Sequence, residues 1–354
     1  MTNALITGWG MYAPSRVMTN NDLSKLVDTS DEWIVSRTGI RERRIAADDE
    51  TTTTLAVNAA RDALVVAGLD PSEVDLVIVG TCSPDYYMPA TAVTVAHELG
   101  AHRAAGFDLM AACSGFVFSL ATATAYVRSG MYRNVVVVGV ELLSRFLDYT
   151  DRNTCVLFGD GAGAVLVSAS DQPGGLLGLD MYSDGSGKEG IIFPAGGSAC
   201  PTSPKTVAEG GHYVHMAGKE VYRYATRQLA ESSRAALASA GLGVDDIDQF
   251  LFHQANLRII ESVQAAVGIP SEKTYLNIEK YGNTSAASVP MALVEAIAAG
   301  RIKPGDRLLM AAFGAGYTAG AAVVEWTADP ARAFLAPGSQ TRLGQPQREL
   351  VATG

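Results

Sequence analysis

The stretch Gly106-Phe-Asp-Leu-Met-Ala-Ala-Cys-Ser-Gly-Phe-Val-Phe-Ser-Leu120 decides how the rest of the chain is interpreted. Its first part, Phe107 to Met110, is apolar and predicts a short strand, and an apolar pattern with helical spacing follows Gly115. Cys113 stands between them, where the unpaired N–H groups and the electropositive end of a helix favour a thiolate. Cys113 is therefore a candidate nucleophile. The alternative is an inert core cysteine, because free cysteine is among the most buried residue types.

The composition excludes several classes of protein. Of the 354 residues 48% are hydrophobic and 18% charged, so the chain can bury a large core and is not disordered. The net charge of -10 argues against binding to nucleic acid or to a membrane surface. The cysteines lack CxxC spacing, which favours a reducing, cytoplasmic compartment, and the histidines show no metal-ligand spacing. No basic residue precedes Arg16, so we expect no signal peptide.

Alternating strand and helix patterns predict an α/β fold with buried, largely parallel sheets. Thr51 to Gly68 has helical spacing and ends in a glycine, which is typical of a helix C-cap. Continuous apolar segments at Val74 to Gly80 and at Asn134 to Val140 predict buried strands. The uncharged segment Leu308 to Val324 approaches the length of a membrane span, but its glycines favour two strands joined by a turn.

The second part of the chain repeats the first. The segment Ala67-Gly-Leu-Asp-Pro-Ser-Glu-Val-Asp75 is matched by Ala240-Gly-Leu-Gly-Val-Asp-Asp-Ile-Asp248, and a helix precedes and a strand follows each copy. The duplication predicts two related halves with a site at their junction. We assign residues 1–172 to the N-terminal half and residues 173–328 to the C-terminal half. Residues 329–354 form an extension with no readable function.

Two polar residues of the second half also stand at turns. His253 ends a predicted strand, where sites of α/β proteins tend to form, and Asn283 opens a helix. Taken singly, the first is better explained as a hydrogen-bonded core histidine and the second as a cap residue. Together with Cys113 they form a candidate catalytic set, because each sits at a strand-end turn of the duplicated scaffold.

Six short motifs carry a resemblance to a known family. They are Ala112-Cys-Ser-Gly115, His253-Gln-Ala-Asn256, Gly282-Asn-Thr-Ser285, Phe313-Gly-Ala-Gly316, Asp31-Glu-Trp-Ile-Val-Ser-Arg-Thr-Gly-Ile-Arg-Glu-Arg43 and Phe158-Gly-Asp-Gly-Ala-Gly163. The first four resemble the Cys/His/Asn condensing enzymes of the thiolase superfamily, and the last two narrow the resemblance to β-ketoacyl-acyl carrier protein synthase III. The resemblance implies a thiolase-like fold, with two duplicated αβ halves whose buried mixed sheets lie in an α-β-α-β-α arrangement.

The same resemblance implies an acyltransferase that starts fatty acid synthesis and needs no cofactor or metal. An acyl-CoA would give its acyl group to Cys113, while the backbone N–H groups of Cys113 and Ala315 form the oxyanion hole. Malonyl-acyl carrier protein would then lose CO₂, and His253 and Asn283 would donate hydrogen bonds to the enolate. The carbanion would attack the Cys113 thioester and give β-ketoacyl-acyl carrier protein.

Binding residues follow from the matched positions. Trp33 and Arg152 would sandwich the adenine of CoA, Arg37 would meet its phosphates, and Asn256 would contact the pantetheine arm. Met88 would line the acyl pocket across the interface of a homodimer, or would only pack at that interface.

Arg223 and Arg258 match positions that dock the acyl carrier protein. Ala265 and Ala266 stand where the family often has a basic pair, which leaves the strength of carrier docking open. Two other functions also stay open: a condensing enzyme or acyltransferase of the same fold in secondary metabolism, and a thioester hydrolase that uses the same Cys/His pair.

Overall fold

Two sheets with related strand orders organise the part of the chain that the computed structural model describes, residues 2–332. The first sheet has the order β1 (Asn3–Tyr12), β7 (Gly161–Ser170), β6 (Asn134–Glu141), β4 (Leu76–Gly80) and β5 (Ala105–Leu109). The second has the order β8 (Gly175–Tyr182), β13 (Thr318–Glu325), β12 (Arg307–Gly314) and β11 (Gln249–Phe252).

The pairing directions repeat as well as the order. β4 is parallel to β6 and β11 is parallel to β12, whereas β7 and β13 run antiparallel to both of their neighbours. Both sheets are therefore mixed rather than largely parallel. The duplication inferred from Gly68 and Gly241 is confirmed in detail, because both glycines end a helix in the left-handed conformation, with φ of 68° and 69°. The predicted boundary between residues 172 and 173 falls in the connection from β7 to β8.

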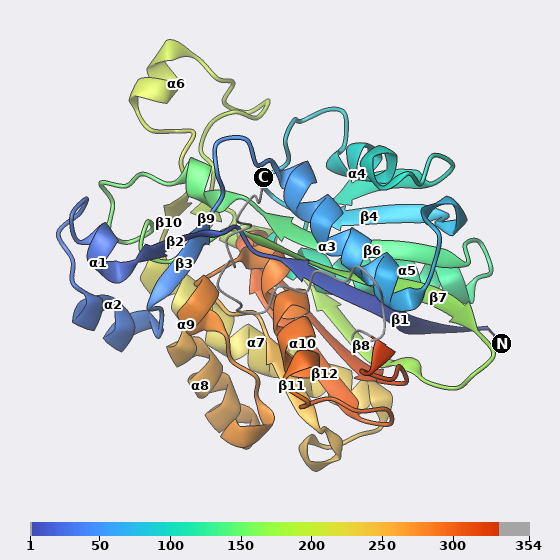
Figure 1. Cartoon of the computed structure of the whole chain (residues 1–354). Helices are drawn as coiled ribbons and strands as arrows, with labels where there is room; N and C mark the ends of the chain where they lie inside the picture. Colours follow the sequence, from blue (N-terminus) through green and yellow to red (C-terminus); the bar gives the residue numbers. More distant parts are fainter. Residues whose placement is uncertain (1, 333–354) are drawn as a thin grey trace, which may run out of the picture.

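Helices and sheets alternate in five layers (Figure 1). The outer face of the first sheet is covered by α3 (Thr52–Ala67) and α4 (Thr91–Leu99), drawn in blue and teal. The middle layer holds α5 (Gly115–Arg128) and α10 (Ser288–Ala298), and α7 (Gly218–Ala240) and α8 (Leu257–Val267) lie beyond the second sheet. Every residue of α10 from Ser288 to Ile297 is buried, including Glu295, and the predominantly apolar sequence of this helix suits its place between two sheets.

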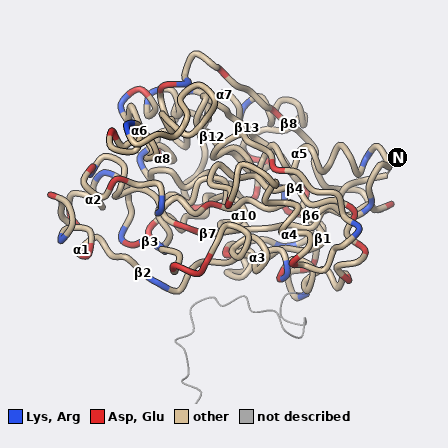
Figure 2. The backbone as a smooth tube through the Cα atoms, turned by 90° about the horizontal axis from the view of Figure 1, so that it is seen from above, with Lys and Arg blue, Asp and Glu red and all other residues tan. Residues whose placement is uncertain are grey.

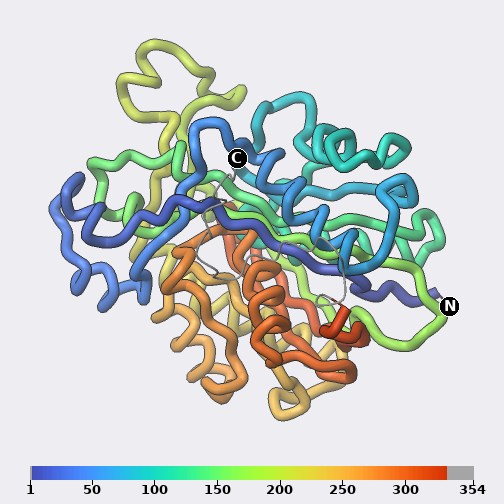
Figure 3. The backbone as a smooth tube through the Cα atoms, in the orientation of Figure 1, coloured from blue at the N-terminus to red at the C-terminus, as the bar shows by residue number. Residues whose placement is uncertain are grey.

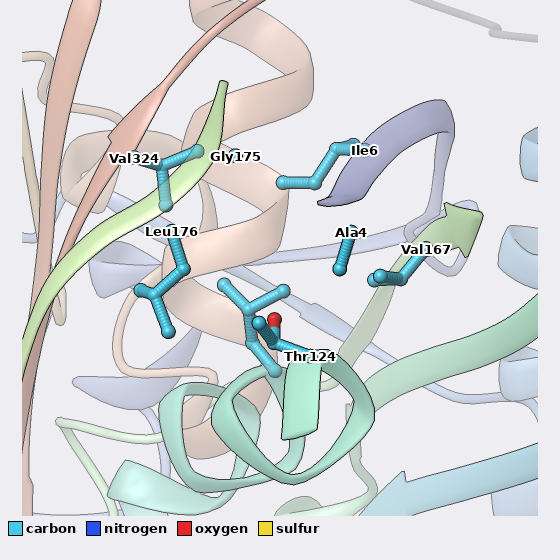
Figure 4. A pocket seen from close by; sticks show the side chains of 8 residues that line it. Ala4, Ile6, Thr124, Val167, Gly175, Leu176 and Val324 are labelled. Carbon is cyan, nitrogen blue, oxygen red and sulfur yellow. The ribbon is translucent and has the colours of Figure 1, made fainter. Parts of the chain in front are cut away.

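The cores of the two halves meet between the sheets. Figure 4 shows Ala4 and Ile6 of β1 facing Leu176 of β8 and Val324 of β13, around a small apolar pocket that α5 closes with Thr124. Strands from both halves thus pack against each other directly, which fixes one sheet relative to the other and leaves no polar site at this point.

Smaller elements lie around this framework. They are α1 (Asn20–Leu23), α2 (Asp31–Thr38), α6 (Pro204–Ala208), α9 (Ile278–Tyr281), β2 (Arg16–Thr19), β3 (Glu42–Ile45), β9 (Ile191–Ile192) and β10 (His215–Met216). The segment that carries α6 stands out from the body of the molecule, in yellow-green (Figure 3). Figure 2 shows acidic and basic positions interspersed over the outer parts of the molecule. Among the described residues no helix is both long and apolar enough to cross a membrane.

The expected elements are found, with shifted ends. The segment Leu308 to Val324 forms β12, a turn and β13, as predicted. The strand before the cysteine is β5, which ends at Leu109, so Met110 lies outside it and is exposed. Of the extension, residues 333–354 lie outside the part of the chain that the structure describes.

Candidate active site

One cavity of about 540 Å³ gathers the candidate catalytic residues of both halves. Cys113 comes from the turn before α5, His253 from the end of β11, Asn283 from the turn before α10, and Ala315 from the turn between β12 and β13. The rest of the lining is largely apolar, which is typical of a site that binds an organic substrate and excludes water.

The turn that carries Cys113 is strained. Ala112 has a φ of +48°, which is rare for a residue with a side chain and costs roughly 1–3 kcal/mol. The residues Ala112–Ser114 form a short 3-10 turn, η2, and α5 starts at once after it. This strand-to-helix elbow holds Cys113 at the wall of the cavity.

The second half contains a copy of this elbow. Ser285 also has a φ of +48° and opens the 3-10 turn η7 (Ser285–Ala287), which leads into α10. The turn packs closely on β6, because a Cβ on Gly139 would lie 2.2 Å from the carbonyl oxygen of Ala286. The two elbows meet at the cavity, where the hydroxyl oxygen of Ser285 lies at a hydrogen-bond distance of 3.2 Å from the sulfur of Cys113.

The turn η8 (Ala315–Tyr317) packs against the elbow that carries Cys113. A Cβ on Gly314 would lie 2.6 Å from the backbone nitrogen of Cys113, so only glycine permits this approach. The hydroxyl of Thr318 donates to the carbonyl of Ala111 over 2.9 Å. These contacts place the backbone of Ala315, the residue after Gly314, beside Cys113.

Burial governs the protonation of Cys113. Loss of hydration raises the pKa of the thiol to about 12, although the hydrogen bond from Ser285 opposes this shift. This shift outweighs the expected stabilisation of a thiolate by the helix N-terminus, so a Cys113 that acts as a nucleophile would start as a thiol. Its proton must leave as the sulfur attacks.

His253 is a buried, neutral histidine. It is only 4% exposed, and burial lowers its pKa to about 3. Its Nδ1 lies 3.0 Å from the hydroxyl of Ser288, which in turn lies 3.3 Å from that of Thr284. A neutral imidazole cannot assist Cys113 as a cation, so His253 does not stabilise the thiolate by charge.

Asn283 is held by three hydrogen bonds. Its Oδ1 accepts from the backbone N–H of Ser285 over 2.8 Å, its own N–H donates to Leu157, and its carbonyl accepts from Gly159. The first bond fixes the amide plane and turns the Nδ2 donor away from Ser285. Asn283 is thus both the turn residue that its sequence context suggests and a wall of the cavity.

The residues predicted to bind CoA lie together outside the catalytic group. Trp33 is on α2, and the guanidinium carbons of Arg37 and Arg152 lie 4.5 and 5.2 Å from the centre of its ring. Arg152 is also anchored by a hydrogen bond to the carbonyl of Asp28. Asn256 lines the cavity, caps α8 and donates to the carbonyl of Arg37, so it connects the cavity with this face.

The remaining predicted residues are exposed. Met88 is 84% exposed and does not line the cavity of its own chain. Arg223 on α7 and Arg258 on α8 lie next to Tyr222, a cavity residue whose hydroxyl donates to the carbonyl of Arg258 over 3.4 Å. Both arginines therefore stand near the rim of the cavity.

Sequence reasoning missed three residues that shape the site, Ser285, Ser288 and Thr318. Ser285 lies within one of the quoted motifs, and alignment of the two elbows would have placed it opposite Ala112. His253, the partner of Ser288, and Ala111, the partner of Thr318, lie 35 and 207 positions away, so no local pattern reveals these contacts. The described residues contain no group of three His, Cys, Asp or Glu residues that could hold a metal ion.

Comparisons with known proteins show which family the chain belongs to. Models of 3-oxoacyl-[acyl-carrier-protein] synthase III match residues 107–185 and, for its C-terminal part, residues 237–326. The β-ketoacyl-[acyl-carrier-protein] synthase III of Roseiflexus sp. (strain RS-1) is 51% identical over 92% of this chain and 99% of the relative. The chain belongs to the β-ketoacyl-acyl carrier protein synthase III family.

Solved structures of the family confirm the predicted thiolase-like α/β fold. The 3-oxoacyl-[acyl-carrier-protein] synthase III of Aquifex aeolicus VF5 is 44% identical, covers 92% of this chain and 100% of its own, and gives a TM-score of 0.84. The priming β-ketosynthase of the R1128 polyketide pathway is 40% identical, with 93% and 97% coverage and a TM-score of 0.86.

Proposed function

We propose that Cys113, His253 and Asn283 carry out a decarboxylative Claisen condensation in the 540 Å³ cavity. As a member of its family, the chain is an acyltransferase-type condensing enzyme that joins an acyl-CoA to malonyl-acyl carrier protein at the start of fatty acid synthesis. The observation that carries the residue assignment is the convergence of a thiol, a neutral imidazole and an amide from both halves on one apolar cavity.

Cys113 attacks the thioester of the acyl-CoA and keeps the acyl group while CoA leaves. The carbonyl oxygen then needs donors, and the backbone N–H groups of Cys113 and Ala315 supply them. The close approach of Gly314 to the nitrogen of Cys113 supports this oxyanion hole. One such donor typically contributes ~10²-fold or more to the rate.

His253 and Asn283 serve the malonyl half-reaction as neutral donors. Nδ1 of His253 lies 3.0 Å from the hydroxyl of Ser288. In the tautomer in which Nδ1 accepts from that hydroxyl, Nε2 carries the proton and can donate it to the enolate oxygen. The depressed pKa of His253, about 3, keeps the imidazole in this neutral form. Two neutral donors stabilise an enolate but cannot activate water, which favours condensation over hydrolysis.

The remaining binding roles belong to the residues on α2 and next to it, outside the catalytic group. Trp33 and Arg152 hold the adenine, Arg37 contacts the phosphates, and Asn256 guides the pantetheine arm to Cys113. No cofactor takes part, because the CoA thioester is itself the substrate.

The enzyme works as a cytoplasmic homodimer. Met88, which is exposed in the single chain, would then be covered by the partner subunit and complete the acyl pocket of that subunit. Arg223 and Arg258 at the rim dock the acidic carrier, with neither nucleic acid nor membrane as a partner.

The test supplies purified protein with malonyl-acyl carrier protein and a panel of short, branched and medium acyl-CoAs, and follows the carrier by intact mass. We expect β-ketoacyl-carrier from at least one primer, and no acyl mass on Cys113→Ala. His253→Ala should lose decarboxylation more than acyl transfer. No product across the panel, or free acid formed without malonyl-carrier, would reject the condensation.

A second function is tested by the same panel. One solved relative is a priming ketosynthase of a polyketide pathway, so we propose as the alternative a condensing enzyme of the same fold that serves secondary metabolism. Condensation that requires a carrier other than that of fatty acid synthesis would favour it.

A further inference from the structure

A buried carboxylate stands behind Ser285, and none of the steps above uses it. Glu141 ends β6 and its side chain is fully buried. Its Oε1 lies 3.0 Å from the hydroxyl oxygen of Ser285, which lies 3.2 Å from the sulfur of Cys113. The three side chains form a continuous path from the nucleophile to a carboxylate in the core.

The surroundings of Glu141 suit a group that gains and loses a proton. Donors from the segment after β4 point at it: the hydroxyl of Ser83 at 2.5 Å, that of Thr81 at 3.3 Å, and the N–H and thiol of Cys82 at 3.1 and 3.2 Å. These donors favour the anion, whereas burial raises the pKa of Glu141 above its ordinary value. The titratable groups that face it are Cys82 and, through Ser285, Cys113, and no Lys or Arg is in contact with it within residues 2–332.

The hydroxyl of Ser285 has only one proton for two neighbours. With Glu141 ionised, Ser285 donates to the carboxylate and accepts from the thiol of Cys113. With Glu141 protonated, the carboxylic acid donates to Ser285, and Ser285 donates to the sulfur as a thiolate. Moving one proton along each hydrogen bond converts the first arrangement into the second without moving a heavy atom.

We propose that Ser285 and Glu141 form a proton relay for Cys113, in which Ser285 is a catalytic residue and Glu141 a positioning residue that acts through it. As the sulfur attacks the acyl-CoA, the S–H bond breaks, its proton passes to Ser285, and the proton of Ser285 passes to Glu141. The new S–C bond forms, and CoA leaves as a thiolate that solvent protonates. Glu141 stays neutral beside the acyl-enzyme.

The second half-reaction returns the proton. The carbanion formed by loss of CO₂ attacks the acyl carbon, and the bond from that carbon to Cys113 breaks with its electron pair on the sulfur. Ser285 then donates to the sulfur, and Glu141 gives its proton to Ser285. The thiol and the carboxylate are restored, so one proton is stored between the two half-reactions.

The relay also explains how His253 serves only one step. If His253 took the proton of Cys113, it would become a cation in a place where burial lowers its pKa to about 3. The path through Ser285 leaves the imidazole neutral, and in one tautomer, throughout the cycle.

The test follows the first half-reaction alone, which is independent of malonyl-carrier. Glu141→Gln keeps the size of the side chain and one acceptor oxygen but accepts no proton, and Ser285→Ala breaks the path next to Cys113. Rapid-quench intact mass measures acylation of Cys113 between pH 6 and 9. At pH 7 we expect each variant to be slower by roughly 10²-fold, the usual contribution of a general base.

The pH profile separates a relay from a structural role. In the wild type the rate levels off once Glu141 is ionised. In both variants solvent must ionise the thiol, so the rate rises about tenfold per pH unit up to pH 9 and the deficit shrinks. The double variant should be no slower than either single variant. A profile parallel to the wild type, or a wild-type rate for Ser285→Ala, would overturn the relay.

Three controls complete the experiment. Glu141→Asp keeps a carboxylate and should keep the wild-type shape of the profile at a lower rate. Glu50→Gln alters a hydrogen-bonded carboxylate that does not line the cavity, and should acylate like the wild type. The relay rests on the proposed role of Cys113, and its failure is distinguishable: normal acylation without condensation counts against the proposed function alone.

Discussion

The buried imidazole of His253 should make the protein sensitive to mild acid. In the unfolded chain histidine has a pKa of about 6.5, whereas in the fold that of His253 is about 3. Because the folded pKa is depressed, the unfolded state binds the additional proton, and stability is lost as the pH falls below 6.5. At pH 5.0, which lies 1.5 units below the unfolded value and well above the folded one, this group should lower the free energy of unfolding by about 2 kcal/mol relative to pH 7.5.

The assay compares wild type and His253→Asn by urea unfolding at pH 7.5 and pH 5.0, at one protein concentration. The variant loses packing at both pH values, so the quantity of interest is the difference between them. That difference should be smaller in His253→Asn by about 2 kcal/mol. The exposed His102→Asn should keep the wild-type difference. Equal pH dependence in wild type and His253→Asn would show that His253 is not buried in neutral form.

Other expectations concern substrate binding and close packing. Trp33→Ala should raise KM for acyl-CoA roughly 5- to 100-fold, as the loss of one base-stacking face does, and leave KM for acyl-pantetheine unchanged; an equal effect on both would reject adenine binding. Gly314→Ala should slow acylation of Cys113 about 10²-fold in a protein with an unchanged circular dichroism spectrum, because its methyl group displaces one oxyanion donor. Gly139→Ala should lower unfolding free energy by roughly 1–3 kcal/mol in urea, whereas Gly197→Ala, whose methyl group meets no atom within 4 Å, should not.

Local sequence patterns predicted the helices and turns whose stabilising interactions lie within one segment of the chain. The helix from Thr51 to Gly68 was predictable because its cap residue, its apolar spacing and its terminal glycine all lie within the segment. The position of Cys113 at a strand-to-helix turn followed from the same kind of pattern. The duplicated segments predicted two related halves, and the two sheets do have related strand orders.

Local patterns could not predict the contacts between segments that are far apart in the sequence. Ser285 and Cys113 are 172 positions apart in sequence, and Ser285 and Glu141 are 144 apart. No periodic pattern in the sequence indicates that Gly139 on β6 lets the second elbow pack closely against this strand. The sequence showed the helix terminus that favours a thiolate at Cys113 but not the burial that raises the pKa of the thiol and opposes this effect.

The two half-reactions proposed for the cavity would make opposite demands on it, and the duplicated elbow would reconcile them. A dry, apolar cavity keeps His253 neutral and protects the acyl-enzyme from water, but the same dryness raises the pKa of Cys113 to about 12. An attack at neutral pH therefore needs a proton acceptor that does not itself bring a permanent charge to the sulfur. The second elbow sets a hydroxyl, Ser285, at the nucleophile and keeps the charge of Glu141 one hydrogen bond further away, among donors that hold it. A serine suits this position because its small hydroxyl can pass on a proton without carrying a charge itself.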